Sequence, residues 1–138
     1  MPTGTKSVGA LALATVAAAA FAGAVYAQSP SVNVTDQKPT RNTVTIADVN
    51  LPKRGFVAIH ASDASGNMNK TIVGYAALKA GDHKAVKVRL TGAHKAGETL
   101  WVVAHESKGR YLGKRGRRNI GAPFTQDGKV VDQSFKTL

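Results

Sequence analysis

The stretch TVTIADVNLPKRGFVAIHA, residues 43–61, decides the fold of this chain. Before its turn, LPKRG, apolar residues recur at short intervals, first Val44 and Ile46 and then Val49 and Leu51. After the turn, GFVAIHA alternates in the same way. Because alternate side chains point to opposite faces of a β-strand, this period of two predicts one strand on each side of the turn.

The same period recurs along the rest of the chain. Further strands are predicted at residues 31–35, 71–78, 83–90, 99–105 and 129–138, which makes seven candidates in all. Turn signals such as KAGDH, KAGE and QDGK separate them, and beyond residue 27 no segment of ten or more residues has a helical period. This pattern predicts an all-β fold, an immunoglobulin-like antiparallel β-sandwich of about seven strands.

The first 27 residues have the layout of a signal peptide. Lys6 is their only charge, the run from Val8 to Ala27 is uncharged, and its end offers small residues to a signal peptidase. We expect cleavage after Ala27. The alternative is that residues 8–27 are retained as a membrane anchor. In both cases the remaining chain is expected to be exported, to the periplasm or the cell surface.

The 111 residues that follow Ala27 are expected to form one domain. Residues 28–42 are polar, contain two prolines and are interpreted as an N-terminal extension. Residues 43–138 are assigned to the sandwich, with a basic loop at 107–121. The chain has no cysteine, which excludes disulfides, cysteine-ligated zinc and iron–sulfur sites, and thiol chemistry.

Charge indicates the class of partner. The full chain has 19 lysines and arginines and 8 acidic residues, and loss of Lys6 lowers its formal charge from +11 to +10. Such a charge attracts polyanions. Outside the membrane these are acidic proteins, anionic lipids, cell-wall polymers, lipopolysaccharide and extracellular nucleic acid. No motif for sequence-specific nucleic-acid recognition is present.

The order LPKRGFVAIH, LKAGDHKAVKVRL, ETLWVVAH and GAPFTQDGKVVDQ resembles an uncharacterised exported domain family of archaeal and bacterial surface proteins, usually described as immunoglobulin-like. The resemblance runs from about Val44 to Gln133 and implies the sandwich and the export, without assigned chemistry. The residues that carry it are Gly55, Phe56, Val57, Ile59, His60, Ala80, Gly81, Asp82, His83, Val86, Val88, Leu90, Leu100, His105, Pro123, Phe124, Asp127, Gly128 and Val131. One departure is the basic loop, because such domains tend to carry an acidic Asp/Gly-rich loop after the strand that ends at His105.

The basic loop is the best candidate for a binding element. From residue 108 to 118, six cations occupy eleven positions with no acidic residue among them, and their mutual repulsion favours an anionic partner. Arginine outnumbers lysine, and its planar fork suits carboxylate and phosphate. Cations at positions 53, 54, 84, 87, 89 and 95 extend the basic surface if they share a face with the loop. The alternative is a solvated insertion. The predicted partner-binding residues are Lys108, Arg110, Tyr111, Lys114, Arg115, Arg117 and Arg118.

These features predict a non-enzymatic, cofactor-free structural or accessory protein that docks on an acidic protein or membrane complex. The alternative is a sequence-independent polyanion binder. No serine lies in a nucleophile-elbow context, and neighbouring acidic residues and histidines on a strand point to opposite faces. Asn33 and Asn69 start Asn-x-Ser/Thr sequons, which matter only in a source that glycosylates exported proteins.

A third hypothesis is a metal site. His60 and His105 end apolar strands, and imidazole suits zinc or copper. If the two strands are neighbours, the rings are able to converge. The competing interpretation is that each ring only hydrogen-bonds a loop carbonyl.

Overall fold

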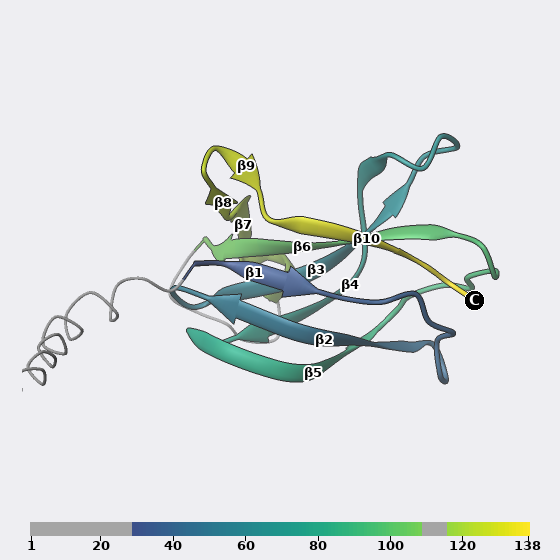
Figure 1. The fold of residues 1–138 in the computed structure, drawn as a ribbon, viewed down its shortest axis with the longest axis horizontal. Helices are drawn as coiled ribbons and strands as arrows, with labels where there is room; N and C mark the ends of the chain where they lie inside the picture. The colour runs from purple at the N-terminus through teal and green to yellow at the C-terminus, as the bar shows by residue number, and fades with distance from the viewer. Residues whose placement is uncertain (1–28, 109–115) are drawn as a thin grey trace, which may run out of the picture.

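The computed structural model describes residues 29–108 and 116–138 as a sandwich of two antiparallel sheets (Figure 1). The smaller sheet has the order β1 (Ser31–Asn33), β2 (Thr43–Leu51) and β5 (Gly81–Arg89). The larger sheet has the order β10 (Asp132–Lys136), β6 (Thr99–Ser107), β3 (Gly55–Ser62) and β4 (Met68–Leu78), and β7 (Ile120–Pro123) also pairs with β6. A 3-10 turn, η2 (Gly116–Asn119), precedes β7, and β8 (Thr125–Gln126) pairs with β9 (Lys129–Val130).

The predicted all-β sandwich is therefore confirmed. About ten strands are present rather than seven, because β7, β8 and β9 are too short to show a period in the sequence. The predicted signal segment 1–27 lies outside the described residues, as do four predicted docking residues, Arg110, Tyr111, Lys114 and Arg115. Among the described residues, no helix has the length and apolar character needed to cross a bilayer.

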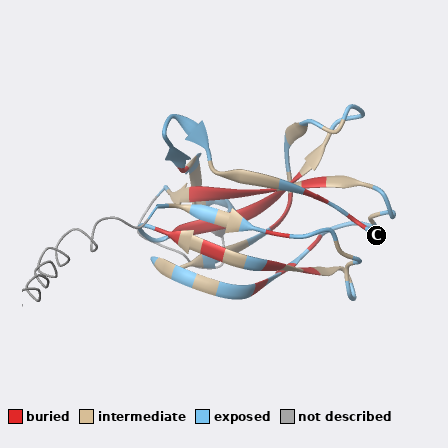
Figure 2. Cartoon of the chain, viewed as in Figure 1, coloured by how far each residue is buried: buried red, intermediate tan, exposed pale blue. Residues whose placement is uncertain are grey.

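The core lies between the two sheets, as the alternating strands require. β2 buries alternate residues on each side of Ala47 and β5 buries Val86 and Val88, whereas β3 and β6 are buried along most of their length (Figure 2). The larger sheet therefore also has a covered outer face. The principal core residues are Val44, Ile46, Val49, Leu51, Val57, Ile59, Val86, Val88, Leu90, Leu100, Val102, Ala104, Phe124 and Phe135.

The spacing of the apolar residues in β2 reflects an irregularity in the sheet. Ile46 pairs with Val86 and Asp48 pairs with Lys84, but the intervening Ala47 has no registered partner on β5. Opposite this point Ala85 has a φ of 50°, a left-handed conformation that is uncommon for a residue with a side chain. The irregularity shifts the alternation by one residue, and Val49 therefore faces the core.

Residues 29–42, the described part of the predicted extension, belong to the sandwich, which therefore begins before the expected boundary at residue 43. β1 pairs with β2, and the side chain of Val34 is only 2% exposed within the core. The side-chain amide of Gln37 bonds both the N–H and the carbonyl of Thr45, at 2.8 and 2.9 Å. Its backbone N–H donates to the carbonyl of Lys136 in β10. The polar composition of this segment concealed its role because one buried valine and backbone contacts hold it in place.

Candidate functional site

The outer face of the larger sheet brings His60 and His105 together. β3 and β6 are neighbours, and their register opposes Phe56 to His105, Ala58 to Val103 and His60 to Trp101. The two histidines therefore occupy diagonal corners of one patch, with Ala58 and Val103 between them. Residues two apart on a strand share a face, so all six side chains lie on the same side of the sheet. The condition for the histidines to converge is met.

The two imidazole rings meet corner to corner. Their Nε2 atoms are 3.2 Å apart, their ring centroids are 5.4 Å apart and their planes are inclined by 15°. The centroid separation exceeds the Nε2–Nε2 distance by about two ring radii, so the two Nε2 atoms lie close to the line between the ring centres. The rings are therefore edge to edge rather than face to face. His60 is 8% exposed and His105 is 6% exposed, so water has little access to either ring.

Both Nδ1 atoms are bonded to backbone carbonyls. His60 Nδ1 lies 3.0 Å from the carbonyl oxygen of Asn69, and His105 Nδ1 lies 2.8 Å from that of Gly121. A carbonyl oxygen only accepts, so each Nδ1 must carry the proton and donate it. In the neutral rings both Nε2 atoms are then lone-pair acceptors, and they point at each other. The two lone pairs repel each other unless a proton or another cation lies between or beside them.

The surroundings of His105 favour its neutral form. Burial lowers the pKa of His105 below its ordinary value, and the neighbouring His60 lowers it further, whereas the hydrogen bond to Gly121 opposes both effects. A neutral imidazole is the form that ligates metals. Within the described part of the chain, however, no group of three or more histidine, cysteine or acidic side chains is placed to hold a metal ion. The two histidines stand without a third protein ligand of these types there.

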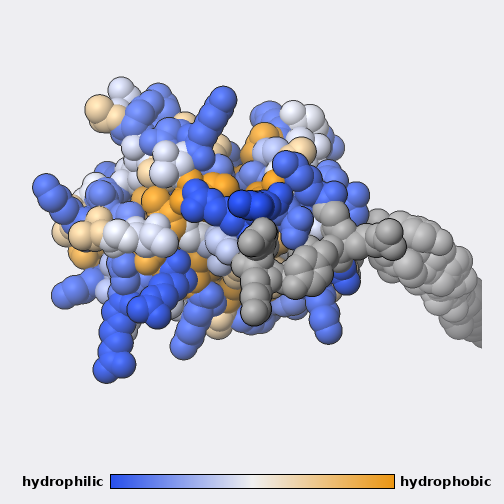
Figure 3. All heavy atoms as spheres, turned by 180° about the vertical axis from the view of Figure 1, so that it is seen from behind, coloured by the Kyte–Doolittle hydropathy of each residue, from blue (hydrophilic) through white to orange (hydrophobic). Residues whose placement is uncertain are grey.

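Three predicted docking residues are described. Lys108, Arg117 and Arg118 are all exposed. Arg117 in η2 reaches past β3 to the far strand of the sheet, where its Nη2 donates to the carbonyl of Ile72 in β4 at 3.2 Å. The rear view of the molecule shows a hydrophobic area at the surface that is partly covered by strongly hydrophilic residues (Figure 3). The described end of the basic loop therefore lies over the outer face.

Arg117 shares a small hollow with Arg89. The hollow has a volume of about 110 Å³ and lies where β4 meets β5, with no acidic residue in its lining. Gly74 makes this approach possible, because a Cβ at that position would lie 2.7 Å from the carbonyl oxygen of Arg89. From the sequence, Arg89 was identified only as one of six cations that extend the basic surface if they share a face with the loop, because the face of Arg89 depends on contact between strands of different sheets. The lining residues are Ile72, Val73, Gly74, Tyr75, Arg89, Thr91 and Arg117.

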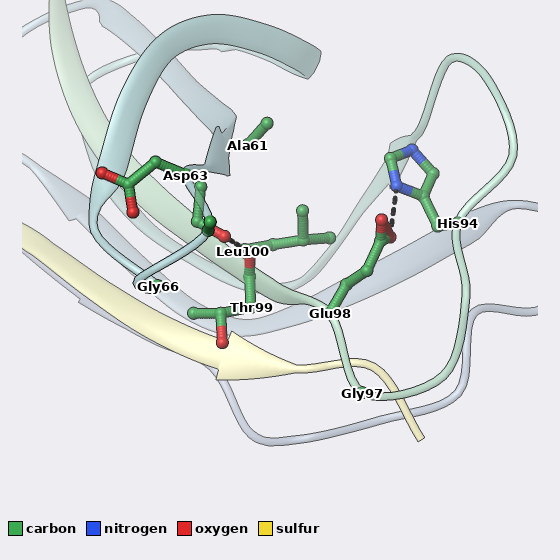
Figure 4. A pocket seen from close by; sticks show the side chains of 10 residues that line it. Ala61, Asp63, Gly66, His94, Gly97, Glu98, Thr99 and Leu100 are labelled. Carbon is green, nitrogen blue, oxygen red and sulfur yellow. Dashed lines mark hydrogen bonds and ion pairs between the residues drawn. The ribbon is translucent and has the colours of Figure 1, made fainter.

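A larger hollow, of about 360 Å³, lies at the β3–β4 turn and the loop before β6 (Figure 4). His94 Nδ1 is 2.9 Å from a carboxylate oxygen of Glu98, and its Nε2 is 2.9 Å from the carbonyl of Thr91. Asp63, on the other side, accepts the N–H groups of Ser65 and Asn67 and so closes a turn. These polar groups are bonded to the protein itself.

Comparison with known proteins gives one match. A family model described as Domain of unknown function (DUF7282) covers residues 30–137. This confirms the resemblance to an uncharacterised domain family and includes β1, in agreement with the structure. No curated protein and no solved structure matches the chain.

Proposed function

We propose that this chain, which belongs to the DUF7282 family, is an exported, non-enzymatic accessory protein that docks on an acidic protein surface at the extracytoplasmic face. The observation that carries the proposal is the convergence of Arg89 and Arg117 on one hollow without an acidic neighbour in the lining. Two guanidinium groups in a shared hollow repel each other unless an anion lies between them. The exposed Lys108 and Arg118 extend the cationic surface along the same segment.

The acidic side chains of the domain support this interpretation. Most of them are already engaged locally, whereas neither arginine of the hollow takes part in an ion pair among the described residues. The positive charge at the hollow is therefore left for an external partner. Asp48 and Asp82 are bonded to Lys84, Glu106 to Lys53, Glu98 to His94, Asp63 to the turn amides, and Asp36 to the backbone N–H of Lys136.

The size and lining of the hollow favour a carboxylate side chain. Sites for whole small molecules measure about 300–1,000 Å³, whereas this hollow has about 110 Å³, enough for the end of one side chain. Arg117 uses one Nη2 on Ile72 and retains further donors, and a guanidinium binds a carboxylate through two parallel bonds. Tyr75, 37% exposed, lines the hollow and supplies the aromatic contact that interfaces favour.

The test is a salt-step elution of the protein from its native envelope fraction, with charge-reversed variants. Arg89→Glu together with Arg117→Glu is expected to elute at much lower salt than the wild type and to remain folded, because both side chains are exposed. Lys129→Glu, on the β8–β9 hairpin, is the matched control and is expected to elute near the wild-type position. Co-elution with a fixed set of proteins supports docking.

The competing outcome is the polyanion binder. In that case Lys129→Glu weakens binding as much as a single reversal in the hollow, since only total charge matters. The logarithm of the affinity for anionic polymers would then fall linearly with the logarithm of salt concentration, with no preference among polymers of equal charge density. That result would overturn the proposal.

A further inference from the structure

Two buried lone pairs aimed at each other call for a cation. His60 and His105 are both more than nine-tenths buried, both Nδ1 atoms are committed to carbonyls, and both Nε2 atoms face one point. We propose that the Nε2 atoms of His60 and His105 bind one divalent transition-metal ion of the zinc or copper type. The site is independent of the basic hollow, and its test does not depend on docking.

The Nδ1 hydrogen bonds of His60 and His105 are of the kind made by histidines that ligate metals. A histidine bound to a metal almost always donates its second ring N–H to a carbonyl, carboxylate or water, which fixes the tautomer and the ring orientation. Asn69 and Gly121 supply such carbonyls, from the start of β4 and from β7. Both rings are therefore held in advance with Nδ1 donating to a carbonyl and Nε2 directed at the partner ring. A histidine that merely filled the core edge would need only one such bond, without a second lone pair opposite.

The spacing of the two nitrogen atoms fits one ion. With Zn–N bonds of about 2.0–2.1 Å and tetrahedral angles, two ligating nitrogens lie about 3.3 Å apart. The observed Nε2–Nε2 distance is 3.2 Å. The ion lies to one side of the line between the nitrogens, and each ring must turn by about 35° to aim its lone pair at an ion with tetrahedral angles. Imidazole nitrogen also selects this class of metal over calcium or magnesium, which take oxygen ligands.

The coordination is open. Because no third histidine, cysteine or acidic side chain joins the pair among the described residues, the remaining positions are filled by water or by a donor brought from outside. A site with free positions is typical of metals that bind or exchange ligands rather than of purely structural zinc, which is closed by four protein ligands. The ion is not part of the hydrophobic core, which lies on the other face of the larger sheet, and we expect the fold to form without it.

The experiment uses untagged protein, stripped with a chelator and dialysed against Zn²⁺ or Cu²⁺ at pH 7.5, followed by elemental analysis of the folded fraction. The wild type is expected to retain one ion per chain. His60→Ala and His105→Ala are expected to lose it. His83→Ala is the matched control and is expected to retain it, because His83 lies in another sheet and only bonds the Lys79 carbonyl.

Loss of folding in the histidine variants would not decide the question, so the wild type is also examined by ¹⁵N NMR of its imidazoles. On addition of Zn²⁺, the Nε2 resonances of two histidines are expected to shift, while their Nδ1 resonances keep the chemical shift of a protonated nitrogen. A folded wild type that takes up no stoichiometric metal overturns the proposal. The proposal is also overturned if, at saturating Zn²⁺, a single proton is found shared between the two Nε2 atoms.

Discussion

His60 and His105 lie at diagonal corners of a patch three residue pairs long, yet their Nε2 atoms are 3.2 Å apart. The rings cross this span because the central pair includes Ala58, whose side chain is a single methyl group. Ala58 is completely buried. The contact therefore requires a small residue at this position, because the β3–β6 register alone does not bring the rings together.

Enlarging Ala58 is therefore expected to part the rings. Ala58→Leu should destabilise the fold by about 1–3 kcal/mol, the usual cost of overfilling a packed site, and should abolish metal retention. Denaturant unfolding measures the first effect. Ala77→Leu, on the same face but exposed on β4, is the control and should change stability by about 0.5 kcal/mol or less. Equal effects of both variants would show that Ala58 does not make room for the rings.

Gly74 is expected to control the hollow between β4 and β5. In Gly74→Ala the added methyl group would lie 2.7 Å from the Arg89 carbonyl oxygen and 2.9 Å from Val88 Cγ1. The strands must then separate, at a cost of about 1–3 kcal/mol. Arg89 would move away from Arg117, so elution from the envelope fraction should shift to lower salt. An unchanged midpoint of unfolding would contradict this account of the junction.

Removing residues 29–42 should unfold the domain. A chain that begins at Thr43 loses β1, the buried Val34 and the bonds of Gln37 to β2. We expect poor dispersion in its NMR spectrum, whereas a chain that begins at residue 29 should be fully folded. A milder variant, Gln37→Ala, should cost about 1–3 kcal/mol because it leaves Thr45 backbone groups unpaired. Normal folding of the shorter chain would restore the boundary at residue 43.

Asp132 is expected to lower stability at neutral pH. Burial raises its pKa above the ordinary value of 3.8, so the folded protein binds the proton more readily than the unfolded chain. The ionised form therefore costs stability at pH 7, and this cost disappears as the pH falls through the folded-state pKa towards 3.8. Asp132→Asn should be slightly more stable at pH 7, by about 0.5 kcal/mol or less. Thermal unfolding of both proteins from pH 7 to pH 3 should show the difference shrinking to zero.

The sequence predicted the parts of the structure that depend on local period. The alternation in β2, including the step from Ile46 to Val49, and the apolar run of β6 were sufficient to define the sandwich and its core. The convergence of His60 and His105 was predicted only on the condition that β3 and β6 pair, since strand order is not encoded in the period.

Two features were predicted only in part, because they depend on contacts between distant segments. Arg89 joins Arg117 only through the close approach of β4 and β5 at Gly74, two strands of different sheets. The alternation at residues 31–35 predicted a strand there, but its pairing with β2 and the bond of Gln37 to β10 were not predicted, because the segment has few apolar residues. The amino-acid composition indicates neither of these contacts.

The Arg117–Ile72 bond has a further consequence, for the solubility of the protein. β4 is a long strand at the edge of its sheet, where free carbonyl and N–H groups invite a strand from another molecule. The carbonyl of Ile72 is occupied by Arg117, and that of Val73 accepts both the N–H and the hydroxyl of Thr91. The pairing with β3 is also irregular beside these residues. The carbonyls of Ile72 and Val73 are thus already bonded within the protein, which disfavours pairing of this part of β4 with a strand of another molecule.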